Sequence, residues 1–134
     1  MSIQAIASEF LQSPARVTVG SEELSANHRV KQIVEVVDGA VKDRRLIEML
    51  KKYHDGSNRI IIFALYKKEA DRIHQLVERS TSFKVNAIHG DRSQETRSAA
   101  MEAFKSGKCP LLIATDVAAR GLDIPDVEFV VNYT

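Results

Sequence analysis

Two polar segments of the chain combine residue types that suit phosphate or ribose binding. In the first, Gly90 would let another molecule approach the backbone, and Gln94 and Arg97 stand three residues apart. On a helix these two side chains would share one face near its start, where free backbone N–H groups also gather. An amide and a guanidinium at that place suit a phosphodiester oxygen. Alternatively, Arg97 could form a surface ion pair with Asp91 or Glu95, and the pattern alone favours neither interpretation.

The second polar segment runs from Thr115 to Asp123 and follows an apolar stretch. Thr115 and Asp116 could cap a short helical turn and expose its N–H groups. Arg120 precedes Gly121, which frees the backbone, and Asp123 could accept a hydrogen bond from a ribose hydroxyl. A purely structural interpretation makes Asp116 an N-cap and Asp123 a turn residue. The convergence of three polar residue types at one place favours binding.

Strands and helices alternate along the chain, and they must position both segments. β-branched and apolar runs predict strands at residues 32–37, 60–64, 84–89, 111–114 and 128–133. Apolar residues at helical spacing predict helices at residues 3–11, 43–53, 68–79 and 94–106. Ser93 is the expected N-cap of the last helix, and Gly107 is expected to stop it.

This order of elements predicts the fold class. Strands that alternate with helices give an α/β fold, here a parallel sheet of about five strands with right-handed crossovers and flanking helices. Ligands bind at the carboxyl ends of the strands in such sheets. Both polar segments follow predicted strands, so we expect them to meet at the same end of the sheet.

The two ends of the chain depart from this pattern. A predicted helix ends at Pro14, and residues 17–27 are polar without a clear period, which indicates a linker. We expect residues 1–27 to be the end of a preceding domain with an interdomain linker, and residues 28–134 to be a partial α/β domain. The alternative is an N-terminal arm docked on its own domain. A covering helix would normally follow the last strand, so we interpret the stop at Thr134 as a truncation.

Composition limits the kind of ligand contact. The 134 residues carry a formal net charge of +1, which predicts a few donors in a cleft and not a basic face. Aromatic residues make up 6% with no Trp, so a wide platform for stacking bases is not expected. The single cysteine, Cys109, permits neither an internal disulfide nor a zinc cluster, which fits an intracellular location.

Several other classes of site and location are not expected. The four histidines are scattered, so no metal site is predicted, and there is no GxxxxGK[ST] loop, GxGxxG or HExxH motif. The chain alone is therefore not expected to bind a triphosphate. No apolar run approaches the ~20 residues of a membrane span, and the N-terminus does not have the pattern of a signal peptide.

Four segments resemble motifs of the DEAD-box RNA helicases. The sequence HGDRSQETR at residues 89–97 resembles the Q-x-x-R motif, and ATDVAARGLD at residues 114–123 matches motif V. Residues 61–64 resemble the start of motif IV, and residues 23–34 resemble the junction between the two helicase domains. The resemblance covers essentially the whole chain, which is similar to the C-terminal RecA-like domain of that family.

The resemblance implies RNA-binding roles for residues of both segments. Gln94, Arg97 and Thr115 would hold the phosphate backbone of single-stranded RNA, and Gly90 would allow its close approach. Contacts to phosphates carry no sequence information, so binding would be independent of sequence. Contacts to the ribose 2′-OH would favour RNA over DNA.

The resemblance also implies roles in ATP use. Asp123, with Gly121 beside it, would contact the ATP ribose, while Mg²⁺ would be held by the first RecA-like domain, the expected partner of this chain. Arg120 would face the DEAD residues of that domain and couple RNA binding to ATP binding. Phe63 would be a packing residue that supports the arginines of the ATP site.

Three departures from the family pattern stand out. Tyr66 occupies a place where motif IV usually has Thr or Ser, and Thr96 replaces the Glu of Q-x-E-R. The H-R-x-G-R-x-x-R motif expected after the last strand is absent, and its arginines stabilise charge on the γ-phosphoryl group. The chain is therefore expected to be inactive as an ATPase, although its parent would be an ATP-dependent RNA helicase.

Two other functions remain open at this stage. The missing ATP machinery and the near-neutral charge would also fit a non-catalytic RNA- or protein-binding module, and a DNA translocase of the wider superfamily is a third possibility. Residues 63–70 look most like the subgroup that acts in nucleolar ribosome assembly, which predicts a nuclear or nucleolar location.

Overall fold

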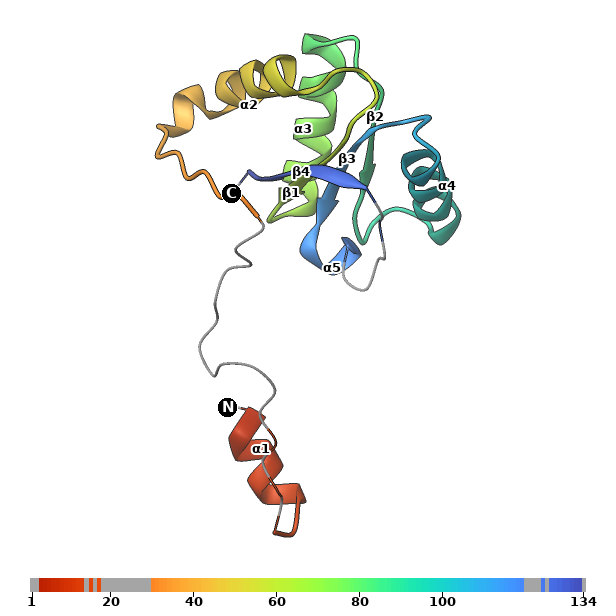
Figure 1. Cartoon of the computed structure of the whole chain (residues 1–134). Coiled ribbons are helices and arrows are strands. Elements are labelled where there is room, and N and C mark those ends of the chain that lie inside the picture. Colours follow the sequence, from red (N-terminus) through yellow and green to blue (C-terminus); the bar gives the residue numbers. More distant parts are fainter. Residues whose placement is uncertain are drawn as a thin grey trace. The chain divides into compact units, whose positions relative to one another are not determined.

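The structure is a computed structural model that describes residues 3–13, 15, 17, 30–119, 124 and 126–133. It divides into two compact units, Met1–Glu35 and Val36–Thr134 (Figure 1). The first unit contains helix α1 (Ile3–Phe10), which confirms the helix predicted there. The predicted boundary after residue 27 lies outside the described residues, so the division into 1–27 and 28–134 stays a prediction.

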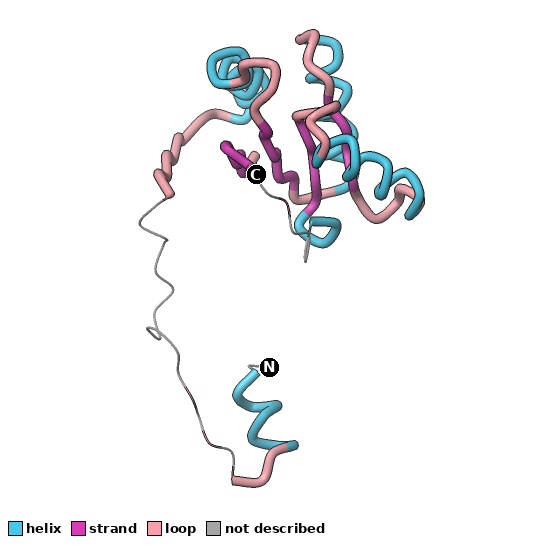
Figure 2. The backbone as a smooth tube through the Cα atoms, turned by 45° about the vertical axis from the view of Figure 1, so that its right-hand side comes forward, coloured by secondary structure: helices cyan, strands magenta, loops and turns pink. Residues whose placement is uncertain are grey.

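The second unit contains a four-stranded parallel sheet (Figure 2). Its strands are β1 (Arg59–Ala64), β2 (Val85–Ile88), β3 (Leu111–Thr115) and β4 (Val127–Asn132). They lie in the order β2-β3-β1-β4, and every pairing is parallel. All five residues of β3 are buried, as expected for a central strand covered on both faces. The parallel α/β architecture is confirmed.

The strand predicted at residues 32–37 is wrong. Residues 31–38 have no regular secondary structure and all are exposed, with Val34 at 89% and Val36 at 100%. A β-branched pattern can favour extended backbone, but a strand also needs a neighbour that accepts and donates its ladder hydrogen bonds. No described strand pairs with this segment, so the described sheet has four strands and not five.

Four helices accompany the sheet: α2 (Gly39–Tyr53), α3 (Lys67–Ser80), α4 (Gln94–Lys105) and the short α5 (Asp116–Ala119). α2 begins four residues before its predicted start because the Asp38 side chain caps it, accepting from the Ala40 N–H at 2.8 Å. Ser93 caps α4 as predicted, accepting from the Thr96 N–H at 3.2 Å. Gly107 follows that helix with a φ of +75°, the left-handed conformation that ends helices.

The core lies on both faces of the sheet. On one face α2 and α3 bury Leu50 and Ile73 against Ile60 and Ile62 of β1. On the other face α4 packs its apolar residues against Ile61, which lies between Ile60 and Ile62 in the sequence. Side chains of β1 therefore alternate between the two faces, as expected for a strand. Figure 1 shows α3 and α4 covering opposite faces of the sheet.

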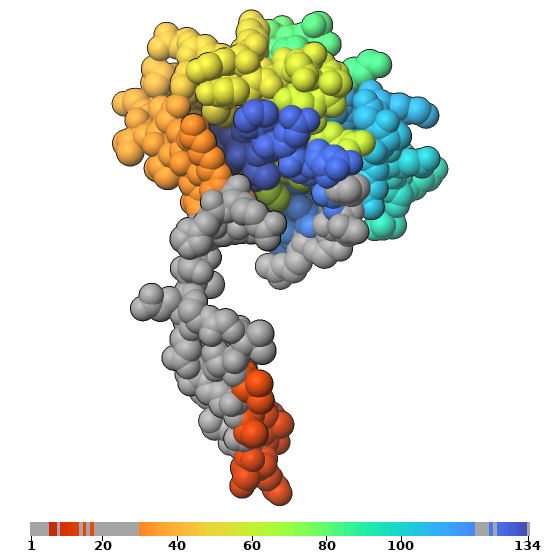
Figure 3. Space-filling view, in the orientation of Figure 1, coloured from red at the N-terminus to blue at the C-terminus, as the bar shows by residue number. Residues whose placement is uncertain are grey.

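β4 is an edge strand and carries an apolar surface. Phe129 is 38% exposed and Val130 57% exposed, and the strand is visible at the surface in the space-filling view (Figure 3). The ring of Phe129 packs against Tyr53 of α2, with 5.4 Å between the centroids. The outer edge of β4 pairs with no strand among the described residues.

One polar cluster ties α2 and α3 to the residue that follows β4. Arg72 donates from Nη1 to the Asp43 carboxylate and from Nη2 to the Tyr133 hydroxyl at 2.9 Å. That hydroxyl in turn donates to Asp43. The hydrogen bond from Arg72 outweighs the effect of burial and, with the bond from Tyr133, holds the pKa of Asp43 below its ordinary value.

The lowered pKa predicts how Asp43 affects stability. A carboxyl whose pKa is lower in the folded state stabilises the protein above its unfolded pKa and loses that effect as the pH falls. Asp43→Asn should therefore reduce the free energy of unfolding at neutral pH by up to about 1 kcal/mol, since both partners are partly exposed. Urea denaturation at several pH values should show this gap closing below about pH 4.

Glu48→Gln is the matched control, because the partners of Glu48 among the described residues are surface arginines of its own helix. It should change the free energy of unfolding by less than about 0.5 kcal/mol. A gap for Asp43→Asn that persists unchanged at pH 2 would show that the ion pair is not its source.

Candidate nucleic-acid interface

The two polar segments begin side by side at one end of the sheet. β2 and β3 are neighbours, and their parallel register places Ile88 opposite Ala114. The next residues are His89, which opens the first segment, and Thr115, which ends β3. We call this place, defined by His89 and Thr115, the carboxyl end of the sheet. The prediction that both segments meet there is confirmed.

Gln94 and Arg97 lie in the first turn of α4. Gln94 is exposed, and its side-chain amide lies 3.5 Å from the Ser98 hydroxyl. Arg97 is half-buried, and its guanidinium forms no hydrogen bond or ion pair with any residue that the structure describes. Asp91, one of the two carboxylates that could have paired with it, is instead bound by Lys67 at 2.8 Å. The guanidinium is thus available to a ligand as far as the described residues show.

Gly90 is exposed, and its surroundings leave room for another molecule. A Cβ atom built there would meet nothing within 4 Å, and the residue is not among the glycines with positive φ. The described part of the fold therefore does not require glycine at this position. The open space next to the backbone is what close approach of a ligand would need.

Thr115 is 8% exposed and ends the central strand. Its hydroxyl has no hydrogen-bond partner among the described residues. Asp116 follows as the first residue of α5 and is exposed. Arg120, Gly121 and Asp123 lie outside the described residues, so the roles expected for them remain predictions.

Two residues of the predicted motif IV segment are placed by the structure. Phe63 of β1 is partly buried against the core cluster under α4. Its predicted packing role agrees with this position, but its support of ATP-site arginines is untested. Tyr66 is 67% exposed at the start of α3 and makes no side-chain capping hydrogen bond there.

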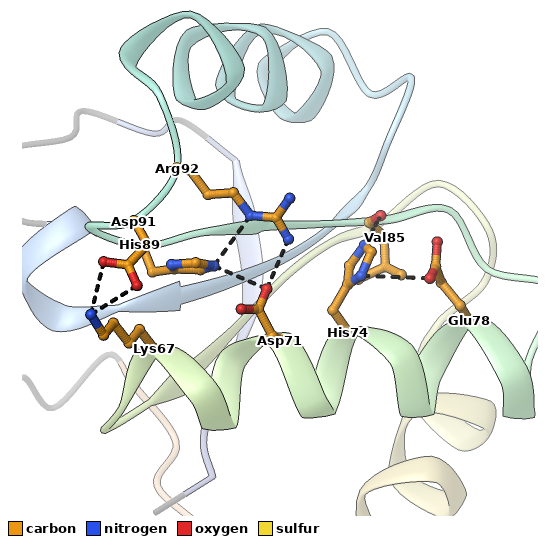
Figure 4. Close-up of polar contacts among 8 residues, drawn as sticks. All are labelled: Lys67, Asp71, His74, Glu78, Val85, His89, Asp91 and Arg92. Carbon is orange, nitrogen blue, oxygen red and sulfur yellow. Dashed lines mark hydrogen bonds and ion pairs between the residues drawn. The ribbon is translucent and has the colours of Figure 1, made fainter.

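A cluster that the sequence analysis missed braces the turn before α4 (Figure 4). His89 is 3% exposed, and its Nε2 lies 3.0 Å from Oδ1 of Asp71 on α3. Arg92 donates from Nη2 to the same oxygen at 2.8 Å. Burial disfavours the charge of Asp71, but the hydrogen bonds from His89 and Arg92 outweigh it and lower its pKa.

The spacing of α3 held a signal for this cluster. Lys67 and Asp71 are four residues apart, so they share one helical face. Both side chains reach the same turn, since Lys67 pairs with Asp91 and Asp71 with Arg92. The buried residues of α3 are Ala70 and the apolar residues after it. A polar pair on such a helix could have indicated that a loop lies next to it.

Metal clusters and membrane spans are two further features that the described residues do not show. Within them, no three His, Cys, Asp or Glu side chains gather as a metal cluster would require. None of the described helices combines the length and apolar character needed to cross a bilayer.

Comparison with known proteins places the chain among helicases. The helicase conserved C-terminal domain family matches residues 41–134. ATP-dependent RNA helicase DBP3 of Debaryomyces hansenii is 54% identical over 136 residues, which cover 98% of this chain and 26% of that protein. The chain therefore spans about a quarter of the length of the curated relatives it matches.

Solved structures agree in fold. The yeast DEAD-box splicing factor Prp28 superposes with a TM-score of 0.69 at 38% identity, over 98% of this chain and 28% of that one. Dbp5 of S. cerevisiae, solved bound to RNA and ADP BeF3, gives a TM-score of 0.62 at 35% identity, over 71% of this chain and 24% of that one. The chain belongs to the helicase conserved C-terminal domain family, as a RecA-like domain of the DEAD-box RNA helicase type.

Proposed function

We propose that this chain is the part of an ATP-dependent RNA helicase that holds the backbone of single-stranded RNA. The observation that carries the proposal is the set of donors that follow β2 and end β3. The Arg97 guanidinium and the Thr115 hydroxyl have no partner among the described residues, and the Gln94 side chain is exposed three residues before Arg97 in the first turn of α4. The RNA-bound structure of the similar protein Dbp5 supports this choice of ligand.

The chemistry of these groups suits phosphates better than bases. A guanidinium and a side-chain amide at the N-terminus of the 12-residue helix α4 both donate hydrogen bonds toward negative charge. Gly90 leaves open space where a sugar–phosphate backbone could lie against the protein. Contacts of this kind hold RNA without reading its sequence, and the formal charge of +1 fits a local grip.

The use of ATP would need more than this chain. By resemblance to the family, Asp123 and Gly121 would contact the ATP nucleotide, and Arg120 would face the first RecA-like domain. The sequence contains neither a GxxxxGK[ST] loop nor an H-R-x-G-R-x-x-R segment. We propose that ATP and Mg²⁺ bind between this chain and the first domain, and that the chain alone does not turn over ATP.

We also propose a cellular setting. Residues 63–70 look most like the helicases of nucleolar ribosome assembly, and the similarity to DBP3 proteins lies in the same part of the family. This favours RNA of the assembling ribosome as the substrate and the nucleolus as the location.

Turnover of ATP tests the whole proposal. We use "the complete helicase" for a protein that carries this chain behind a DEAD-box ATP-binding domain and ahead of an H-R-x-G-R-x-x-R segment. Its ATP turnover should rise when single-stranded RNA is added, because the two domains close on both ligands. This chain alone should show no turnover with or without RNA. A complete helicase that RNA does not stimulate would contradict the proposal.

Charge reversal at Arg97 tests the RNA-binding role. Arg97→Glu should weaken RNA binding by the complete helicase at least about tenfold, because a donor is replaced by a charge that repels phosphate. The free energy of unfolding should change by less than about 0.5 kcal/mol, since the guanidinium has no described partner. Fluorescence anisotropy of a labelled RNA and thermal melting give the two quantities.

Lys105→Glu is the matched control, a charge reversal in the last turn of the same helix. It should change RNA affinity by less than about twofold. Equal weakening by both variants would indicate a general charge effect, and a much lower melting temperature for Arg97→Glu would make Arg97 structural. If this chain alone binds RNA tightly at physiological salt, a non-catalytic RNA-binding module is favoured instead.

Removal of one hydroxyl tests Thr115. Thr115→Val should lower RNA affinity and change the free energy of unfolding by less than about 0.5 kcal/mol, since no described group bonds to that hydroxyl. Thr81→Val is the control, because the Thr81 hydroxyl donates to the Val77 carbonyl at 2.8 Å and accepts from the Phe83 N–H at 3.2 Å. It should cost about 1 kcal/mol in stability and leave RNA affinity unchanged. The reverse pattern would make the Thr115 hydroxyl a structural group.

A further inference from the structure

We propose that Asp71 is a positioning residue for RNA binding, which it would support without contacting RNA. Its carboxylate would hold the turn between β2 and α4, residues 89–93, in the conformation that presents Gly90 and the first turn of α4. The inference rests on the function proposed above, since it concerns the same RNA-binding surface.

The two ends of the turn contact the same oxygen atom of Asp71. Oδ1 of Asp71 lies 3.0 Å from Nε2 of His89 and 2.8 Å from Nη2 of Arg92. His89 is the first residue of the turn, and Arg92 immediately precedes the N-cap, Ser93. One oxygen therefore fixes both the entry and the exit of the turn, as Figure 4 shows.

The buried ring of His89 needs this oxygen as a hydrogen-bond partner. The ring is 3% exposed, and its Nδ1 is buried without a described hydrogen-bond partner. A ring protonated at Nε2 donates to the Asp71 carboxylate, whereas a ring protonated at Nδ1 would accept from Arg92 Nε at 3.2 Å. The first arrangement leaves no buried N–H without an acceptor among the described residues, since Nδ1 has no partner there. Without Asp71 the buried ring would lose this acceptor, which disfavours its present position.

Helix α3, which carries Asp71, is packed firmly against the sheet. Asp71 lies on α3 between Ala70 and Ile73, and those two neighbours are fully buried. The turn is more exposed by comparison, since Gly90 is exposed and Asp91 is bound, among the described residues, by its surface ion pair with Lys67. α3 is thus an anchored element, and the turn takes its position from it.

The Asp71 cluster affects the geometry of the turn more than the stability of the fold. The side chains of Asp71 and Arg92 are 41% and 38% exposed, so water screens their ion pair and its contribution to overall stability is small. The core does not need these contacts, because it packs through apolar residues on both faces of the sheet. The main effect of the cluster is therefore on the geometry of the turn.

The test compares Asp71→Ala with Glu78→Ala in the complete helicase. Glu78 is an acidic residue on the same helix, two turns further on, and its carboxylate lies 3.5 Å from His74 without touching the turn. Asp71→Ala should raise the RNA concentration that half-saturates ATP turnover about five- to tenfold and leave turnover at saturating RNA within about twofold. Glu78→Ala should change neither quantity.

A double variant separates positioning from the RNA contact itself. In an Arg97→Ala background, Asp71→Ala should raise the RNA requirement by a smaller factor than in the parent, because Arg97, the charged donor of the helical turn that Asp71 presents, is already gone. If Arg97→Ala alone has no effect, the proposed RNA-binding function fails. If Arg97→Ala weakens binding but Asp71→Ala does not, or if the two effects multiply in full, the positioning role is overturned.

Asp71→Asn guards against a misfolded variant. If Asp71→Ala melts at a much lower temperature than the parent, Asp71→Asn replaces it, because the amide keeps the shape and one oxygen and loses the charge. It should still raise the RNA requirement in the same direction. An unchanged RNA requirement with Asp71→Asn and Asp71→Ala would overturn the proposal.

Discussion

The parallel register of β3 with its two neighbours is the constraint on which the rest of the structure depends. β3 is buried along its whole length and pairs with β1 on one side and β2 on the other. Parallel pairing sends every strand toward the same end, so residues that follow different strands become neighbours there. Thr115 and His89 are brought together in this way, although they lie 26 positions apart in the sequence. A candidate binding surface results from topology, with no motif of contiguous residues needed.

The elements of the second unit could be predicted because each carries its own local signal. The apolar run of β1 and the capping residue Ser93 act within a few residues, and the structure confirms both. The segment 32–37 has an equally good local signal, yet it forms no strand. A helix satisfies its own backbone groups, whereas a strand needs a partner that its own sequence does not encode. Strand prediction therefore fails where the partner is missing from the described residues.

The candidate site could be predicted in part for a similar reason. Residue type and position after a strand were enough to select Gln94, Arg97 and Thr115. The brace around Asp71 was not foreseen, because its partners His89 and Arg92 lie 18 and 21 residues away in sequence and meet it only after α3 packs on the sheet. Whether Arg97 would pair with Asp91 or Glu95 was also open, and in the structure Asp91 pairs with Lys67.

The exposed side of β4 has a consequence for how this chain behaves in solution. An edge strand that no described strand pairs with, and that exposes apolar side chains such as Phe129 and Val130, is a template onto which another extended chain can add. Pairing of two copies through that strand would be bimolecular, so it would increase with protein concentration.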